Sequence, residues 1–254
     1  MLLAIDVGNT NTVLGLFEGS DLMRSYRVKT DARSTSDEMA LTFRGLLSDK
    51  PKITGVALCS TVPQVLREMR QMIDEYYPDV PHVVVEPGTK TGVPILTDNP
   101  KEVGADRIVN TLAAFTLYGG PSIVVDFGTS TNLDVVSARG EFLGGALAPG
   151  IEISLDALAS RAAQLRKVEL VEPRNVIGKN TVEALQSGAL YGFAGQVDYL
   201  VRRITVELGA VPAAVIATGG LAPIVVPHSE TITAHAPHLT LDGLRLVFDR
   251  NVEA

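Results

Sequence analysis

Two stretches of the sequence have the residue types of a phosphate-binding turn. In the first, apolar residues 2–5 end on Asp6, and Gly8 is followed by short amide and hydroxyl side chains before a second apolar run. A glycine lets the backbone approach a ligand closely, and successive turn N–H groups can surround anionic oxygens. Asp6 is placed to hold a hydrated Mg2+ against them. The alternative is an ordinary hairpin whose Asp and Asn bond their own backbone.

The second stretch repeats this pattern about half a chain later. Residues 123–125 are apolar, Asp126 follows, and Gly128 precedes a group of hydroxyl side chains and a new apolar run. A duplicated phosphate hairpin, with one copy per lobe and a nucleotide between the lobes, resembles the acetate and sugar kinase, Hsp70 and actin superfamily. No Gly-x-x-x-x-Gly-Lys-Ser/Thr sequence occurs, which excludes a P-loop kinase.

Alternating strands and helices are predicted around the first hairpin. Residues 22–28 extend the hairpin to a meander, and a helix begins at Thr35 or Ser36 and runs to about Leu47. A strand, a helix and a short strand are predicted next, over 53–59, 63–76 and 83–85. Such alternation implies parallel pairing with right-handed crossovers. We therefore expect an α/β fold of two ribonuclease-H-like lobes, 1–118 and 119–254, each a mixed sheet flanked by helices and related by internal duplication.

The rest of the chain is predicted to follow the same plan. Pro100 opens a helix whose first turns contain residues 103–108, where Asp106 and Arg107 could also be a plain surface ion pair. The next predicted elements are the hairpin 123–136, a third strand with a glycine-rich exit over 140–150, and a helix over 151–165. A longer helix is predicted from Asn180 towards Leu208, with Asn180 as its cap and Glu183 as the capping-box partner. A strand over 213–217 follows. Glycines 188, 192 and 195 form a stripe that suits either a subunit interface or packing within the chain.

Composition excludes several classes of function. The 254 residues are 46% hydrophobic and carry a net charge of −7 without any block of Lys or Arg, so neither nucleic acid nor an anionic membrane is expected as a partner. The single Cys59 rules out an internal disulfide and suits a buried apolar position. The histidines near the C-terminus lack a regular ligand spacing, which disfavours zinc. Without a signal peptide or an apolar run of about 18 residues, a cytoplasmic location is expected.

Three motifs, in this order and spacing, resemble the signature motifs of type III pantothenate kinases. They are Asp6-Val7-Gly8-Asn9-Thr10, Gly104-Ala105-Asp106-Arg107 and Asp126-Phe127-Gly128-Thr129. The resemblance continues through Gly144-Gly145, Pro149-Gly150, Asn180-Thr181, Thr218-Gly219-Gly220 and residues 239–244, and so covers nearly the whole chain.

The resemblance implies an enzyme that transfers the γ-phosphoryl group of ATP to the primary hydroxyl of pantothenate, giving 4'-phosphopantothenate in the first step of coenzyme A biosynthesis. It implies ATP contacts at Asp6, Val7, Gly8, Asn9, Thr10, Asn11, Thr12, Val13 and Thr129. It implies pantothenate contacts at Gly104, Ala105, Asp106, Arg107 and Thr181, with Asp106 as the proton acceptor.

The resemblance also implies Mg2+, for which Asp6 is the candidate ligand, and a monovalent cation, K+ or NH4+, held by Asp126. It implies a homodimer with the pantothenate site near the subunit interface. One departure is Thr97, which stands where many relatives carry an aromatic substrate contact. Two alternatives stay open: a related small-molecule kinase with another acceptor, and a non-enzymatic regulatory homologue of the Bvg accessory factor type.

Overall fold

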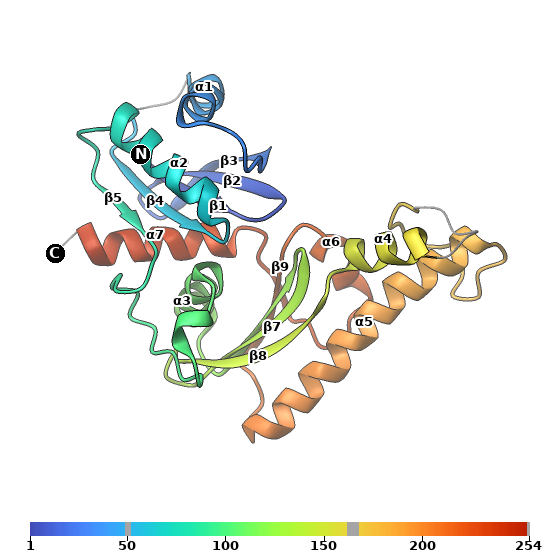
Figure 1. Cartoon of the computed structure of the whole chain (residues 1–254). Helices are drawn as coiled ribbons and strands as arrows, with labels where there is room; N and C mark the ends of the chain where they lie inside the picture. Colours follow the sequence, from blue (N-terminus) through green and yellow to red (C-terminus); the bar gives the residue numbers. More distant parts are fainter. Residues whose placement is uncertain (49–51, 162–167, 253–254) are drawn as a thin grey trace. The chain divides into compact units, whose positions relative to one another are not determined.

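The computed structural model describes residues 1–48, 52–161 and 168–252. The chain forms two compact units, each built around one of the two hairpins (Figure 1). Unit 1 comprises Met1–Gly92, Asn99–Ala113 and Thr240–Ala254, and unit 2 comprises Val93–Asp98 and Ala114–Leu239. The division differs from the expected lobes 1–118 and 119–254, because residues at the end of the chain pack with the N-terminal hairpin.

Unit 1 contains a five-stranded sheet of order β3-β2-β1-β4-β5. Its strands are β1 (Leu2–Val7), β2 (Asn11–Glu18), β3 (Asp21–Lys29), β4 (Gly55–Ser60) and β5 (His82–Val84). Its helical elements are α1 (Ser36–Leu47), α2 (Pro63–Tyr76), the 3-10 turn η1 (Pro100–Glu102), the first part of α3 (Ala105–Tyr118) and all but the first residue of α7 (Leu239–Val252). β1 pairs antiparallel with β2 and parallel with β4, so the sheet is mixed as predicted.

Unit 2 repeats this topology, with the order β10-β9-β6-β7-β8. Its strands are β6 (Ser122–Phe127), β7 (Ser130–Val136), β8 (Phe142–Pro149), β9 (Ala214–Thr218) and β10 (Ala234–His235). Its helices include α4 (Ile151–Arg161), α5 (Thr181–Leu208), α6 (Ala222–Val225) and the 3-10 turn η2 (Val226–His228). The order from β3 to β5 in unit 1 corresponds to the order from β8 to β10 in unit 2, and the equivalent strands pair in the same directions. This correspondence confirms the predicted duplication.

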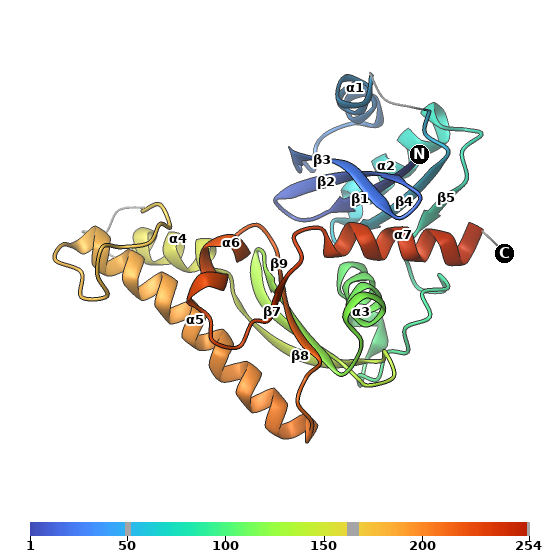
Figure 2. The ribbon, with the colours of Figure 1, turned by 180° about the vertical axis from the view of Figure 1, so that it is seen from behind.

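The two faces of the unit 1 sheet are covered differently. On one face, Leu3, Ile5 and Val7 of β1 join the apolar side chains of α1 and α2 in a core. On the other face α7 lies along the sheet, over the small residues Gly15 and Gly55 (Figures 1 and 2). A Cβ at Gly15 would lie 2.8 Å from Leu241 Cδ1, and a Cβ at Gly55 would clash with the Phe248 ring. The small residues therefore let α7 pack directly on the sheet.

Several local predictions need correction. Pro100 opens only a 3-10 turn, because Val103 is extended (φ −76°, ψ 121°), and α3 begins at Ala105. Asn180 caps α5 as predicted, but the Glu183 carboxylate accepts from the Lys179 N–H rather than from the cap residue. α7 was not predicted at all. The predicted end of the α4 helix, residues 162–165, lies outside the described residues. Among the residues that the structure describes, none of the helices is long and apolar enough to cross a bilayer.

Candidate active site

Asp6 lies near the end of β1, on the sheet face that α7 covers. It stands directly opposite Val13 in β2 and opposite Cys59 in β4. Paired residues of neighbouring strands direct their side chains to the same face. The buried thiol of Cys59 donates a hydrogen bond to Asp6 Oδ1, with an Sγ–Oδ1 distance of 3.4 Å. The carboxylate is thus held at the strand end by the neighbouring parallel strand.

Asp106 belongs to the first turn of α3, within the same unit as Asp6. Its carboxylate accepts hydrogen bonds from its own backbone N–H and from that of Arg107. Residue 104 must be small, because a Cβ there would lie 2.5 Å from Asp106 Oδ1. The glycine of the second motif therefore makes room for the carboxylate at the start of the helix, where the helix dipole favours negative charge.

The negative charge of Asp106 acts on the carboxylate of Asp6. Burial, and then the negative charge of Asp106, raise the pKa of Asp6 to about 7, while the Cys59 hydrogen bond lowers it. Burial raises the pKa of Asp106, against the backbone N–H and the charge of Arg107. Burial, followed by the charges of both carboxylates, raises the pKa of the Cys59 thiol. Two neighbouring carboxylates in such surroundings are a donor set that suits a divalent cation.

The tip of the first hairpin is shaped by backbone bonds. The Gly8 N–H donates to the Asn11 carbonyl at 3.0 Å, and the Thr10 carbonyl accepts from the Thr30 N–H at 3.0 Å. Asn9 and Thr10 are exposed, whereas Asn11 and Val13 are half-buried. The tip therefore presents amide and hydroxyl groups to solvent, as a phosphate cradle requires.

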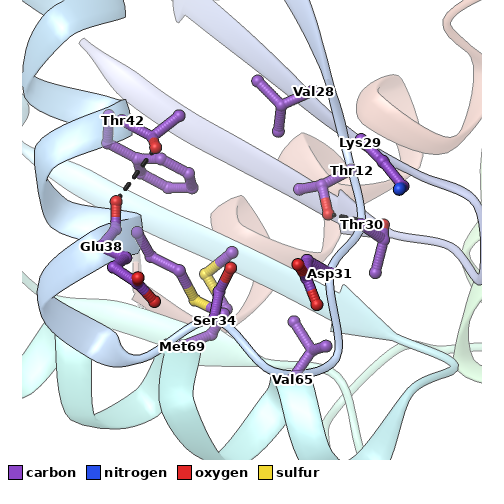
Figure 3. Close-up of a pocket in the computed structure, with 12 residues that line it drawn as sticks. Thr12, Val28, Lys29, Thr30, Asp31, Ser34, Glu38, Thr42, Val65 and Met69 are labelled. Carbon is purple, nitrogen blue, oxygen red and sulfur yellow. Dashed lines mark hydrogen bonds between the residues drawn. The ribbon is translucent and has the colours of Figure 1, made fainter.

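Thr12, which sequence reasoning assigned to the same cradle, directs its side chain elsewhere. It pairs with Val7 rather than with Asp6, so it lies on the face that α1 and α2 cover. Its hydroxyl is bonded to that of Thr30 at 2.9 Å, and it borders a cavity of about 170 Å³ (Figure 3). An ATP contact of Thr12 stays a prediction, and this geometry favours its backbone over its side chain.

The second hairpin holds Asp126 in different surroundings, in unit 2. Asp126 is half-buried and stands opposite Asn132 in β7 and Thr218 in β9. Gly219 has a φ of +91°, and a Cβ there would lie 2.5 Å from Asp126 Oδ1. The Oδ1 atom of Asn132 is buried, and no hydrogen-bond partner for it is found among the residues that the structure describes. A carboxylate oxygen opposite a neutral amide oxygen is a donor set that suits a hard cation such as K+.

Two further predicted residues of unit 2 are exposed. Thr129 is at the hairpin tip, where its carbonyl accepts from the Gly150 N–H at 3.1 Å. Thr181 begins α5 directly after its cap residue Asn180. Further along α5, a Cβ added at Gly188, Gly192 or Gly195 would meet no atom within 4 Å. The glycine stripe is therefore not used for packing within the described part of the chain.

Sequence reasoning missed the contact between Cys59 and Asp6, and treated the cysteine as a small apolar residue. The available signal was its position, because Cys59 ends an apolar run that pairs in parallel with β1. Ends of neighbouring parallel strands meet at one sheet edge, so a polar residue there lies near the strand-end carboxylate.

Comparisons with known proteins agree with this arrangement. The sequence profile described as type III pantothenate kinase matches residues 2–203. The chain is 70% identical to a type III pantothenate kinase of Parafrankia sp. (strain EAN1pec), over 100% of this chain and 99% of that protein. It is 71% identical to one of Frankia alni, over 99% of this chain and 100% of that protein.

Solved structures support the fold alone. A Campylobacter jejuni protein described as a Baf family transcriptional activator has a TM-score of 0.62 at 17% identity, over 99% of this chain and 100% of that one. A ROK hexokinase from Thermus thermophilus has a TM-score of 0.53 at 14% identity, over 99% of both chains. The fold that the two hairpins predicted is confirmed. Given the family profile and relatives that match over the full length, the chain belongs to the type III pantothenate kinase family.

Proposed function

We propose that this chain transfers the γ-phosphoryl group of ATP to the primary hydroxyl of pantothenate, the first step of coenzyme A biosynthesis. The observation that carries the proposal is the pair Asp6 and Asp106, which brings a residue of the first motif beside a residue of the second within one unit. Phosphoryl transfer depends on positioning and charge stabilisation more than on covalent chemistry. Two neighbouring carboxylates, one for a cation and one for the acceptor hydroxyl, meet these needs.

Asp106 accepts the proton of the pantothenate hydroxyl as that oxygen attacks the γ-phosphorus. Its raised pKa supports this role, since a base is most effective when its pKa is nearer the working pH. Arg107 pairs with the pantothenate carboxylate through its planar guanidinium. Gly104, Ala105 and Thr181 complete the substrate contacts. Residues 6–13 and Thr129 contact the ATP phosphates.

Asp6 holds Mg2+, which when bound neutralises phosphate charge. The negative charge that Asp106 imposes on Asp6 supports this assignment, because a cation relieves the repulsion between the two carboxylates. In this role the carboxylate oxygens of Asp6, which has Cys59 as its neighbour, are directed towards the phosphates bound at the turn. A cytoplasmic location fits the free thiol.

Asp126 holds a monovalent cation, K+ or NH4+, with Asn132 Oδ1 as a neutral oxygen beside it. Activity is expected to be lost when both K+ and NH4+ are replaced by a large organic cation at the same ionic strength. Restoring K+ should restore activity, and the same titration followed by the melting temperature reports cation binding without turnover. Full activity in the K+- and NH4+-free buffer would contradict this assignment.

The active species is a homodimer that uses the α5 face bearing the glycine stripe. Support comes from the open space at these glycines and from Tyr199 on the same helix, which is 59% exposed. Gly192→Leu should yield monomers in light scattering and reduce activity, while Gly45→Leu, at another open helical glycine, should not. An active, well-folded Gly192→Leu monomer would refute the dimer.

The direct test is incubation of the protein with ATP, Mg2+, K+ and pantothenate, with mass spectrometry for phosphopantothenate. Acetate and hexoses serve as alternative acceptors in parallel reactions. Phosphorylation of another acceptor in place of pantothenate would point to a related small-molecule kinase. A folded protein that phosphorylates none of them would favour the non-enzymatic regulatory homologue.

A further inference from the structure

The thiol of Cys59 is joined to Asp6 by position and by a hydrogen bond. β4 has only apolar or small residues from Gly55 to Leu58. Cys59 is the first residue of the strand whose side chain can donate a hydrogen bond, and it is fully buried. It faces Asp6 directly across the parallel ladder, and the Sγ–Oδ1 distance is 3.4 Å. An apolar side chain at this place would leave Oδ1 without that donor, and a buried acceptor that loses its partner is costly.

Unit 2 has a hydroxyl side chain at the equivalent ladder position. Thr218 ends the apolar strand β9, is 4% exposed, and stands opposite Asp126 in the parallel ladder between β6 and β9. The duplicated fold thus places a side chain with a single S–H or O–H hydrogen opposite each strand-end carboxylate. A packing role alone would be met by Val or Ala, which fill most other positions of these two strands.

We infer that Cys59 is a positioning residue for the phosphoryl-transfer site, whose S–H···Oδ1 hydrogen bond fixes the Asp6 carboxylate in the orientation that binds the Mg2+–ATP phosphates. This inference rests on the proposed function for its effect on turnover, but its effect on nucleotide binding does not depend on the acceptor. A carboxylate held by one oxygen has its other oxygen in a defined place, whereas an unheld carboxylate must be ordered when the nucleotide binds.

The test compares Cys59→Ser, which keeps a donor of similar size, with Cys59→Ala, which removes the donor. Val56→Ala is the control for lost packing, because Val56 is buried in the same strand and its side chain belongs to the core on the other face. Three quantities are measured in reducing buffer: kcat with the KM values for ATP and pantothenate, the calorimetric affinity for the β,γ-imido analogue of ATP with Mg2+, and the melting temperature.

Cys59→Ala should weaken analogue binding and lower kcat by roughly 3- to 10-fold, the size of one hydrogen bond from a weak S–H donor. Cys59→Ser should restore both to within about 3-fold of the wild type, because a hydroxyl is at least as good a donor. The KM for pantothenate should stay unchanged in both variants. Val56→Ala should lower only the melting temperature.

Equal losses in Cys59→Ser and Cys59→Ala, or a lower melting temperature with unchanged analogue affinity, would overturn the inference. Failure of the proposed function would look different: the wild type would not phosphorylate pantothenate, yet the order of analogue affinities, with wild type and Cys59→Ser above Cys59→Ala, would remain.

Discussion

The two Asp hairpins have the same place in two equivalent sheets, but their surroundings differ. The first turn spans residues 8–10. Asp6 beside it faces the thiol of Cys59, and the negative charge of Asp106 raises its pKa. The second turn spans only residues 128–129, and its Asp126 faces a hydroxyl, an amide and the α-carbon of Gly219. Duplication thus kept the strand-end carboxylate and changed its neighbours. These different neighbours are the basis on which we propose a divalent cation at the first copy and a monovalent cation at the second.

Asp106 sets the first hairpin's surroundings apart, because its negative charge raises the pKa of Asp6. Asp106→Asn cannot take up the hydroxyl proton, so kcat should fall by about 10²–10⁴. Affinity for the ATP analogue should persist, since the turn at residues 8–10 is unchanged. Steady-state kinetics distinguish a base from a residue that only binds the substrate. A raised KM for pantothenate at wild-type kcat would mean that Asp106 contributes ground-state binding only. Wild-type turnover would remove Asp106 as the base.

Gly104→Ala tests how closely the Asp106 carboxylate must be placed. The added Cβ would lie 2.5 Å from Oδ1, so the side chain must move, and displacements of about 1 Å can cost up to ~10² in rate. We expect kcat to fall by roughly 10- to 100-fold with little change in the melting temperature. Gly45→Ala in α1, where a Cβ has open space, is the matched control. Unchanged kcat in Gly104→Ala would show that the site tolerates the shift.

Gly219→Ala is the corresponding test for the second hairpin. Ala would be strained at a φ of +91° and would also press on Asp126 Oδ1 and the Phe127 backbone. Gly209→Ala has a φ of +64° but meets no atom within 4 Å, so it measures backbone strain alone. Strain should cost about 1–2 kcal/mol in each, and Gly219→Ala should lose more in chemical denaturation. Equal losses would mean that the contact with Asp126 is easily relieved.

Asp6→Asn tests the first hairpin through the pH dependence of its stability. Because the pKa of Asp6 is about 7 when folded and near 3.8 when unfolded, the folded state binds more protons between these values. The free energy of unfolding of the metal-free wild type should therefore fall as the pH rises from 4 to 7. Asp6→Asn removes this term and should gain on the order of 1–4 kcal/mol relative to wild type by pH 8.

Denaturation of both proteins in EDTA at pH 5 and pH 8 measures this gain. The variant Asp21→Asn, at an exposed carboxylate of the same sheet, is the control. A difference between Asp6→Asn and wild type that does not change with pH would contradict the raised pKa and weaken the contrast between the two hairpins.

The sequence predicted what depends on local pattern and repetition. Asp6 and Asp126 were recognised because each follows an apolar run before a glycine turn, and the helix after Thr35 followed from a hydroxyl cap and acidic residues in its first turn. Contacts across the chain were not predictable. α7 packs on the sheet because Gly15 and Gly55 leave room for Leu241 and Phe248, and nothing in the local pattern of the helix indicates this partner.

The site was partly predictable for the same reason. The effect of Asp106 on Asp6 depends on how α3 packs in unit 1, whereas the family resemblance supplied only the role of Asp106 as proton acceptor. The resemblance implied an ATP contact at Thr12, whose side chain strand alternation turns to the face opposite Asp6. Side chains alternate between the two faces along a strand, so a known hairpin register would have placed Thr12 on the face opposite Asp6.

The position of α7 bears on how the chain folds as it is synthesised. The first hairpin leaves the ribosome early, but the helix that covers its sheet consists of residues 239–252. Until these residues emerge, the face around Gly15 and Gly55 has no partner from this helix. Unit 2, whose residues end at Leu239, can be complete sooner. Although domains generally fold in order from the N-terminus, the part of this protein that is made first is finished last.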